Sequence, residues 1–413
     1  MEEKSKNKNE RNKIKNKKYY LFSFTKINKY FIFPFICPII CFLSNFFLDL
    51  IMHVKGINNS EFLVSMIFSF SYILGGLLYF ISWIRTKTDQ TRDDAKIYKR
   101  KATFSVKYIY NDGSKKDKMK IFLILLIMSI LLVLIVMFAS FYYNKNILEQ
   151  RIYYLFFIPI FSKILLKLDI FSHQILSLFI AIFGFILLLM PILLMITKND
   201  ILPNIFVFLS SILFSLFLVL CKYLTQFFYI SPYLCNLLIG IISTLMILSL
   251  FIIYSLIRFH NFKYFIDAFN FSNIEINGVI LGLYFFASFF FSIILDTLTI
   301  LIVYYFSPTL FIVTDIISPF LSWLVICIRD GDKRINIIFN SLGYFIVFFS
   351  SLIYNEIIIC NFFGFNKNTK KCIEERQKEE LAALREDESF QNGNQGKNEY
   401  DSSFYTENNE NDG

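Results

Sequence analysis

The chain alternates between long apolar stretches and shorter polar ones, and the apolar stretches determine the fold that we expect. Ten of them are long enough, at about 20 residues, to cross the roughly 30 Å hydrocarbon core of a membrane as a helix. They cover residues 31–52, 62–84, 121–143, 152–168, 174–196, 203–224, 233–257, 278–300, 306–328 and 335–358. Because backbone polar groups find no water in lipid, these stretches should be helical. We therefore predict an all-α, polytopic membrane protein with ten transmembrane helices.

A pattern in the ninth and tenth stretches recurs in the first half of the chain. Pro159-Ile160-Phe161-Ser162 matches Pro319-Phe320-Leu321-Ser322, and each motif is followed in the next apolar stretch by a glycine, Gly184 or Gly343. In the second copy, Gly343 is expected to interrupt the last helix. A hydrophobic hairpin that occurs once in each half indicates duplication of a five-helix unit.

The charged residues lie mainly outside the apolar stretches and predict the topology. Residues 1–29 and 85–120 are rich in Lys and Arg, whereas the alternate loops are poor in them, apart from a local cluster at 329–334. The positive-inside rule therefore places both termini in the cytosol. The expected organisation is a basic cytosolic tail (1–30), a first repeat (31–196) with the basic loop 85–120, a second repeat (197–358), and a cytosolic tail (359–413) that is largely disordered after residue 388.

The composition supports a membrane protein and argues against a soluble domain. The chain is 56% hydrophobic and only 18% charged, so one aqueous core could not bury its apolar surface. The net charge of +9 comes from Lys and Arg that flank apolar stretches, and we expect no nucleic-acid partner. The seven cysteines and three histidines show no metal-ligand spacing, so no metal and no cofactor is predicted.

The two five-helix halves, with Pro-x-x-Ser in the fourth helix and glycine in the fifth helix of each, resemble the drug/metabolite transporter superfamily (EamA-like). Further similarity lies in Cys221-Lys222-Tyr223-Leu224, Ser231-Pro232-Tyr233, and the segment from Tyr304 to Pro319. The eukaryotic branch related to the nucleotide-sugar transporters of solute carrier family 35 is most similar, although its GDP-sugar motifs are missing. The resemblance implies an inverted repeat around a central substrate cavity and alternating access. It also allows a homodimer formed through the fifth and tenth helices.

Asp315 is the first candidate for solute binding. An ionisable side chain inside a membrane span costs ~2.5–3.5 kcal/mol, so it is expected to face protein or water and to have a function. Asn45 and Ser162 belong to the same predicted substrate-binding set. The residues that share part of the helical surface of Asp315 are Thr314, Ser318 and Ser322. The carboxyl group suits a cationic or hydroxyl-rich solute, or a coupling proton; the alternative is a buried carboxyl satisfied by a neighbouring helix.

Prolines and glycines mark the expected hinges and helix contacts. Pro159 and Pro319 each remove a backbone donor and free the carbonyl one turn earlier, which predicts a hinge in each half; the alternative is a tolerated kink. Gly184 and Gly343, together with residues 75–76, are expected to let helices approach closely.

Other polar residues have weaker assignments. Lys222 is interpreted as a membrane anchor rather than a ligand, and Asp49 and Asp296 are expected at helix ends near the membrane interface. Asn270 begins a glycosylation sequon on a predicted outer loop, and whether it is glycosylated is left open.

These features together predict a secondary active transporter of a small organic metabolite, driven by a solute or proton gradient. No phosphate-binding Gly-x-x-x-x-Gly-Lys-Ser/Thr loop occurs, and no clustered catalytic residues indicate an enzyme. We expect a multi-pass protein of an endomembrane (Golgi, endoplasmic reticulum or vacuole) or of the plasma membrane, with lipids and a small solute as its partners. The alternative is a polytopic receptor or scaffold that acts through its cytosolic loop and tail.

Overall fold

Helices account for nearly all of the chain that the computed structural model describes, namely residues 22–24, 32–52, 54, 60–88, 115–142, 150–168, 170–193, 201–228, 230–260, 262, 266, 277–330, 334–361, 369, 372 and 376. The elements are β1 (Phe22–Phe24), α2 (Ile32–Met52), α3 (Ser60–Thr88), α5 (Lys115–Tyr142), α6 (Gln150–Leu166), α7 (Ser172–Leu193), α8 (Ile201–Phe227), α9 (Pro232–Phe259), α11 (Gly278–Tyr305), α12 (Pro308–Asp315), α13 (Ile317–Asp330), α14 (Arg334–Tyr354) and β2 (Ile358–Cys360). The predictions for the basic tail, most of the basic loop, Asn270 and most of the C-terminal tail lie outside the described residues.

Seven of the described helices are long and apolar enough to cross a membrane. They are α3, α5, α7, α8, α9, α11 and α14. The apolar parts of α2 and α6 are shorter, at 36–52 and 156–166. To this extent the prediction of an all-α, multi-pass membrane protein is confirmed.

Large apolar side chains also cover the outside of the helices. Phe179 and Phe183 on α7 are 67% and 56% exposed, and Phe345 on α14 is 66% exposed. Similar side chains recur at helical spacing along α5, α9 and α11. Soluble monomers rarely expose contiguous apolar surface on this scale. These outward faces are therefore suited to contact with lipid tails.

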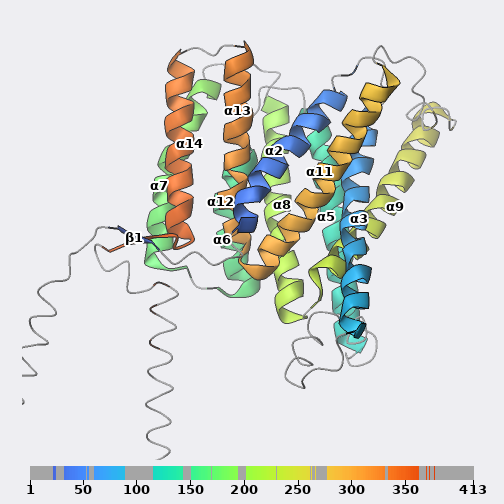
Figure 1. Ribbon diagram of the computed structural model, residues 1–413, viewed down its shortest axis with the longest axis horizontal. Coiled ribbons are helices and arrows are strands. Elements are labelled where there is room, and N and C mark those ends of the chain that lie inside the picture. Colours follow the sequence, from blue (N-terminus) through green and yellow to red (C-terminus); the bar gives the residue numbers. More distant parts are fainter. Residues whose placement is uncertain are drawn as a thin grey trace, which may run out of the picture. The chain divides into compact units, whose positions relative to one another are not determined.

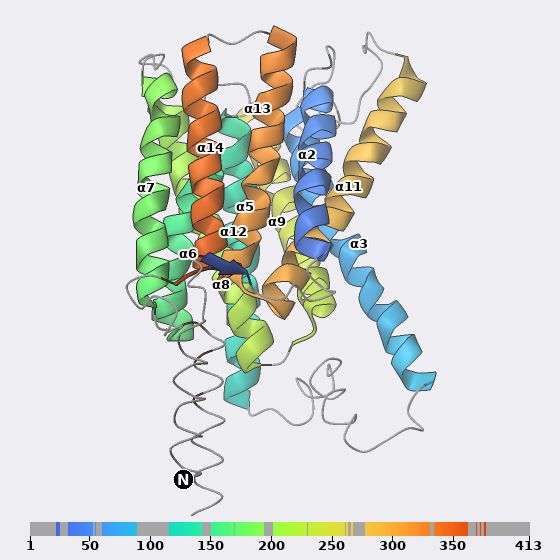
Figure 2. The ribbon, with the colours of Figure 1, turned by 60° about the vertical axis from the view of Figure 1, so that its left-hand side comes forward.

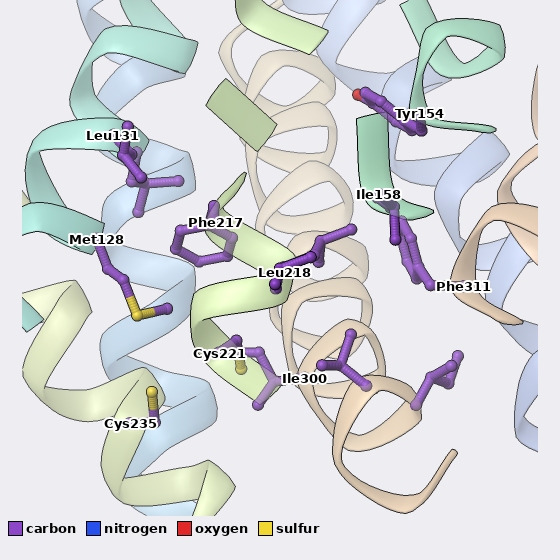
Figure 3. Packing of buried hydrophobic residues seen from close by; sticks show 14 of the residues in the cluster. Met128, Leu131, Tyr154, Ile158, Phe217, Leu218, Cys221, Cys235, Ile300 and Phe311 are labelled. Carbon is purple, nitrogen blue, oxygen red and sulfur yellow. The ribbon is translucent and has the colours of Figure 1, made fainter. Parts of the chain in front are cut away.

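The core is built around α8, which lies among helices from both halves of the chain. Figure 3 shows Phe217 and Leu218 of α8 between Met128 of α5 on one side and Ile158 of α6 on the other. Phe217 and Leu218 are fully buried. Their burial makes α8 the centre of the largest hydrophobic cluster, which also takes in α9, α11 and α12.

The helices pair in a regular way. α3 packs on α9, α2 packs on α11, and α5 packs on α8. α8 also contacts α6, and α2 contacts α12 and α13. α7, from the middle of the chain, and α14, the last of these helices, also lie side by side in both ribbon views (Figures 1 and 2).

Two short strands form an element that the sequence analysis did not anticipate. β1 and β2 pair antiparallel, with Phe22 opposite Cys360 and Phe24 opposite Ile358. The strands come from segments that flank the first and the last described helix, so the pairing brings these two segments together. Burial raises the pKa of the Cys360 thiol, so this thiol stays protonated and is a poor nucleophile.

The structure corrects two details of the predicted hairpin in the second half. The stretch 306–328 was expected to be one helix, but α12 ends at Asp315 and α13 begins at Ile317, with a turn at Ile316. Conversely, α14 runs without interruption through Gly343, which was expected to break it. Glycine lowers helix propensity by only about 1 kcal/mol, and tight packing of neighbouring helices offsets that cost.

Candidate functional site

The break between α12 and α13 is the clearest irregularity in the helical core, and Pro319 explains its position. In a continuous helix, the N–H of residue 319 would donate to the carbonyl of Asp315. Proline has no N–H, and its ring collides with that carbonyl. The helix is interrupted at Ile316, and Pro319 lies in the first turn of α13, where no N–H is needed. The matching Pro159 lies inside a continuous α6.

Asp315 is the last residue of α12, and its side chain is only 5% exposed. The Cys41 thiol of α2 donates a hydrogen bond to Asp315 Oδ1 at a distance of 3.5 Å. The side-chain amide of Asn45 donates in turn to Cys41 Sγ at 3.6 Å. Two predicted site residues from opposite halves of the sequence, Asn45 and Asp315, are therefore connected through one thiol.

The remaining predicted binding residues lie on the neighbouring turns. Ser318 is fully buried in α13, and the hydroxyl of Ser322 donates to its carbonyl oxygen at 3.1 Å. Ser162 of α6 is buried, and its hydroxyl has no hydrogen-bond partner among the described residues. α6 contacts α12, so Ser162 belongs to a helix that adjoins the break. The side chain of Thr314 lies outside what the structure describes.

The break brings two helix ends together beside a buried carboxyl group. α12 ends at Asp315 and α13 begins at Ile317, so a helix C-terminus and a helix N-terminus meet at Ile316. Such interrupted helices present partial charges of both signs at one point in the membrane. The Asp315 carboxyl lies where these two helix ends meet.

Sequence reasoning missed two buried polar contacts between helices. The hydroxyls of Ser44 on α2 and Ser292 on α11 are 2.9 Å apart. On the same helix, Asp296 accepts a hydrogen bond from Ser71 of α3. Asp296 was expected at the membrane interface, but it is 5% exposed and lies well inside α11. Ser71 gave no signal in the sequence, because single serines are common in apolar helices.

Lys222 has a partner that the sequence could not show. Its ammonium group donates to the carbonyl oxygens of Tyr304 at 2.9 Å and of Phe306 at 3.1 Å. These carbonyls lie at the C-terminal end of α11, where the helix dipole favours a positive charge. The expected role as a membrane anchor is thus replaced by a contact inside the protein that stabilises the end of α11.

The two glycines that follow the Pro-x-x-Ser motifs lie at a close contact between α7 and α14. A Cβ atom added to Gly184 would lie 3.1 Å from the carbonyl oxygen of Gly343, and one added to Gly343 would lie 3.0 Å from that of Gly184. The same two helices are joined by the hydroxyl of Ser350, which donates to the carbonyl of Ser177 at 2.6 Å.

Comparison with known proteins adds no assignment. No protein-family model matches the chain, and no curated protein matches it. Within the described residues, no group of three or more His, Cys, Asp or Glu side chains could hold a metal ion.

Proposed function

We propose that the protein is a secondary active transporter of a small organic solute, of the drug/metabolite transporter type. The observation that supports this function most directly is the break at Ile316, next to the buried Asp315. Transporters bind their substrates and coupling ions at such interrupted helices, because free backbone groups are tolerated there only when they line a polar site. Asp315, with Asn45 contributed through Cys41, would hold the solute.

The helix pairing supports an inverted repeat of five helices. If α12 and α13 are counted as one segment, the helices form ten segments, five in each half. α3 and α9 are then the second segments of the two halves, and they pack on each other. A two-fold repeat requires that a contact between the first segment of one half and the third segment of the other occur twice. Both such contacts, α2 with α11 and α8 with α5, are present. The same exchange turns the α3–α11 pair into the α9–α5 pair, and both of these occur too.

The glycine contact supports the same symmetry at the level of single residues. In a contact that lies on a two-fold axis, residue i touches residue j and residue j touches residue i. Gly184 and Gly343 approach each other's carbonyl oxygens in this reciprocal way. They are also the two glycines that follow the matching prolines in the sequence.

Ten crossings are the arrangement that agrees best with the ends of the chain. Besides the seven long helices, α2, α6 and the α12–α13 pair would each complete one crossing. An even number of crossings leaves both termini on one side, and the pairing of β1 with β2 favours such a placement. The connection from β1 to α2 includes Lys26 and Lys29, which makes it too polar to cross the lipid.

The test is binding and transport by the purified protein. A thermal-shift screen against neutral amino acids, monosaccharides, nucleosides and amines should find compounds that raise the melting temperature; a ligand at 100 times its Kd adds about 2.7 kcal/mol to stability. Any compound found is then followed as a radiolabelled solute into lipid vesicles. We expect Asp315→Asn to abolish both the thermal shift and the uptake while the variant remains folded.

Two controls make the result decisive. Asp117→Asn changes an acidic residue in the first turn of α5 and should leave binding and uptake unchanged. A protein that lacks residues 367–413 should still carry the solute if the helices are the transporter. Solute uptake by Asp315→Asn at the wild-type rate would remove Asp315 from the site, and failure of the wild-type protein to carry any compound would count against transport.

A further inference from the structure

Asp296 is a second buried carboxyl in the helical core, and the solute site does not use it. It lies on α11, with nine residues of that helix still to follow. Its hydrogen-bond partner is Ser71 of α3, which is fully buried. A charged carboxylate inside a membrane helix is costly, and the cost is usually offset by a basic partner or avoided by binding a proton.

The hydrogen bonds around Ser71 favour a bound proton on Asp296 over a basic partner. The Ser71 oxygen is within hydrogen-bonding distance of Asp296 Oδ2 and also of the carbonyl oxygen of Phe68, at 2.6 Å. A serine hydroxyl has one hydrogen, so it can donate to only one of these two acceptors. If Asp296 is protonated, its O–H donates to Ser71 Oγ, and Ser71 donates to Phe68. Both contacts then contain a hydrogen.

The neighbouring helices supply no positive charge to Asp296 in the described part of the chain. Tyr72 of α3 interacts with Asp296, and Cys221 of α8 and Cys235 of α9 lie beside Tyr72; none of these side chains has a positively charged form. Lys222 of α8 is directed to the carbonyls of Tyr304 and Phe306. On α2 and α12, Cys41 and Asp315 bond to each other.

A second acceptor at the same helix junction lacks a hydrogen. Asn236 of α9 is 1% exposed, and its Oδ1 has no hydrogen-bond partner among the residues described. Its amide borders Gly75, one turn after Ser71, as does the hydroxyl of Thr297, the residue next to Asp296. Among the described residues, the junction of α3, α9 and α11 therefore holds a buried acceptor without a donor as well as the Ser71–Asp296 contact.

We propose that Asp296 binds the proton that drives transport, while Asp315 binds the solute. This inference rests on the proposed function. On protonation, a proton from water joins Asp296 Oδ2, the new O–H donates to Ser71 Oγ, and Ser71 donates to the Phe68 carbonyl. On release, the proton returns to water, Ser71 turns its hydrogen to the carboxylate, and the Phe68 carbonyl loses this donor. Ser71 thus transmits the protonation state of α11 to the backbone of α3.

Infrared spectroscopy of the purified protein in lipid tests proton binding without any solute. The C=O stretch of a protonated carboxyl should be present at acidic pH and should disappear as the pH is raised. Asp296→Asn should lack this band, Asp315→Asn should keep it, and Ser71→Ala should shift both its frequency and its midpoint pH. A band that survives in Asp296→Asn, or one that stays constant at every pH, would overturn the proposal.

Proton movement then tests the coupling. Vesicles loaded with the pH dye pyranine receive a gradient of a defined mixture of neutral amino acids, monosaccharides and nucleosides. Wild-type protein should change the internal pH, whereas Asp296→Asn should exchange labelled solute without any pH change. Asp296→Glu, which retains a carboxyl group, should restore part of the response and also serves if the Asn variant is unstable.

The outcomes separate the two proposals. Solute transport by the wild-type protein without a pH change refutes proton coupling and leaves the transporter function intact. If the wild-type protein moves no solute at all, the transporter function fails, and the coupling role of Asp296 fails with it. The infrared band still decides whether Asp296 binds a proton.

Discussion

At the scale of single residues, two helical glycines differ in the space that surrounds them. A Cβ atom on Gly76 of α3 would lie 2.5 Å from the Cα and N atoms of Leu237 on α9, whereas one on Gly282 of α11 would meet nothing within 4 Å. A side chain should therefore be excluded at residue 76 and accommodated at residue 282, although both glycines lie inside helices.

We expect Gly76→Ala to lower the free energy of unfolding by about 1–3 kcal/mol, because α3 and α9 would have to move apart. Gly282→Ala should be neutral or stabilising by up to about 1 kcal/mol, since alanine favours the helix. Thermal unfolding of both variants in detergent provides the measurement. Equal melting temperatures for the two variants would show that α3 and α9 do not pack this closely.

Single residues also show how far the sequence could predict the site. Asp315 was identified because one carboxyl in a long apolar stretch is conspicuous, and the structure links it to the predicted Asn45. The depth of Asp296 was misjudged, because the expected span ended at residue 300 whereas α11 continues to Tyr305. The contact between Ser71 and Asp296 depends on helix packing, and no local pattern in the sequence specifies that packing.

At the scale of elements, the two prolines of the matching Pro-x-x-Ser motifs, Pro159 and Pro319, have different consequences. Pro319 follows a break in the helix, while Pro159 lies within a continuous α6. Hydropathy located both helical segments, because length and apolar content determine where a helix can cross the membrane. It could not locate the turn at Ile316, because interrupted and continuous helices share the same apolar composition.

Replacing Pro319 with alanine should shorten or close the break, because the new N–H can donate to the Asp315 carbonyl. We expect slower deuterium exchange of the amides that follow Ile316, measured by mass spectrometry, and slower solute uptake. Pro159→Ala is the matched control; exchange in α6 should change little, because that helix is already continuous. Unchanged exchange around Ile316 in Pro319→Ala would mean that another cause holds the helix open.

At the scale of the whole molecule, the proposed inverted repeat requires an even number of membrane crossings. Seven helices meet the length requirement on their own, and three further segments would complete ten. The pairing of β1 with β2 ties together the segments that flank the first and last helices. Hydropathy predicts ten segments, and the strand pairing adds that the flanks of the first and last described helices meet.

Epitope tags at both termini provide the test. In intact cells, or in sealed vesicles with the outer face outward, neither tag should bind antibody until the membrane is permeabilised. A glycosidase-sensitive mass shift that disappears in Asn270→Gln would independently place that loop on the opposite side. Tags found on opposite sides of the membrane would require an odd number of crossings and would exclude the inverted repeat.

The reciprocal contact of Gly184 and Gly343 has a consequence for motion. With no side chains at the crossing point, the backbones of α7 and α14 touch directly, and Leu188 and Val347 close the space on either side. Such a crossing resists sliding along the helices but permits a change of angle. If the two halves rock against each other, this contact is the pivot. It moves least, and the ends of α7 and α14 that lie farthest from it move most.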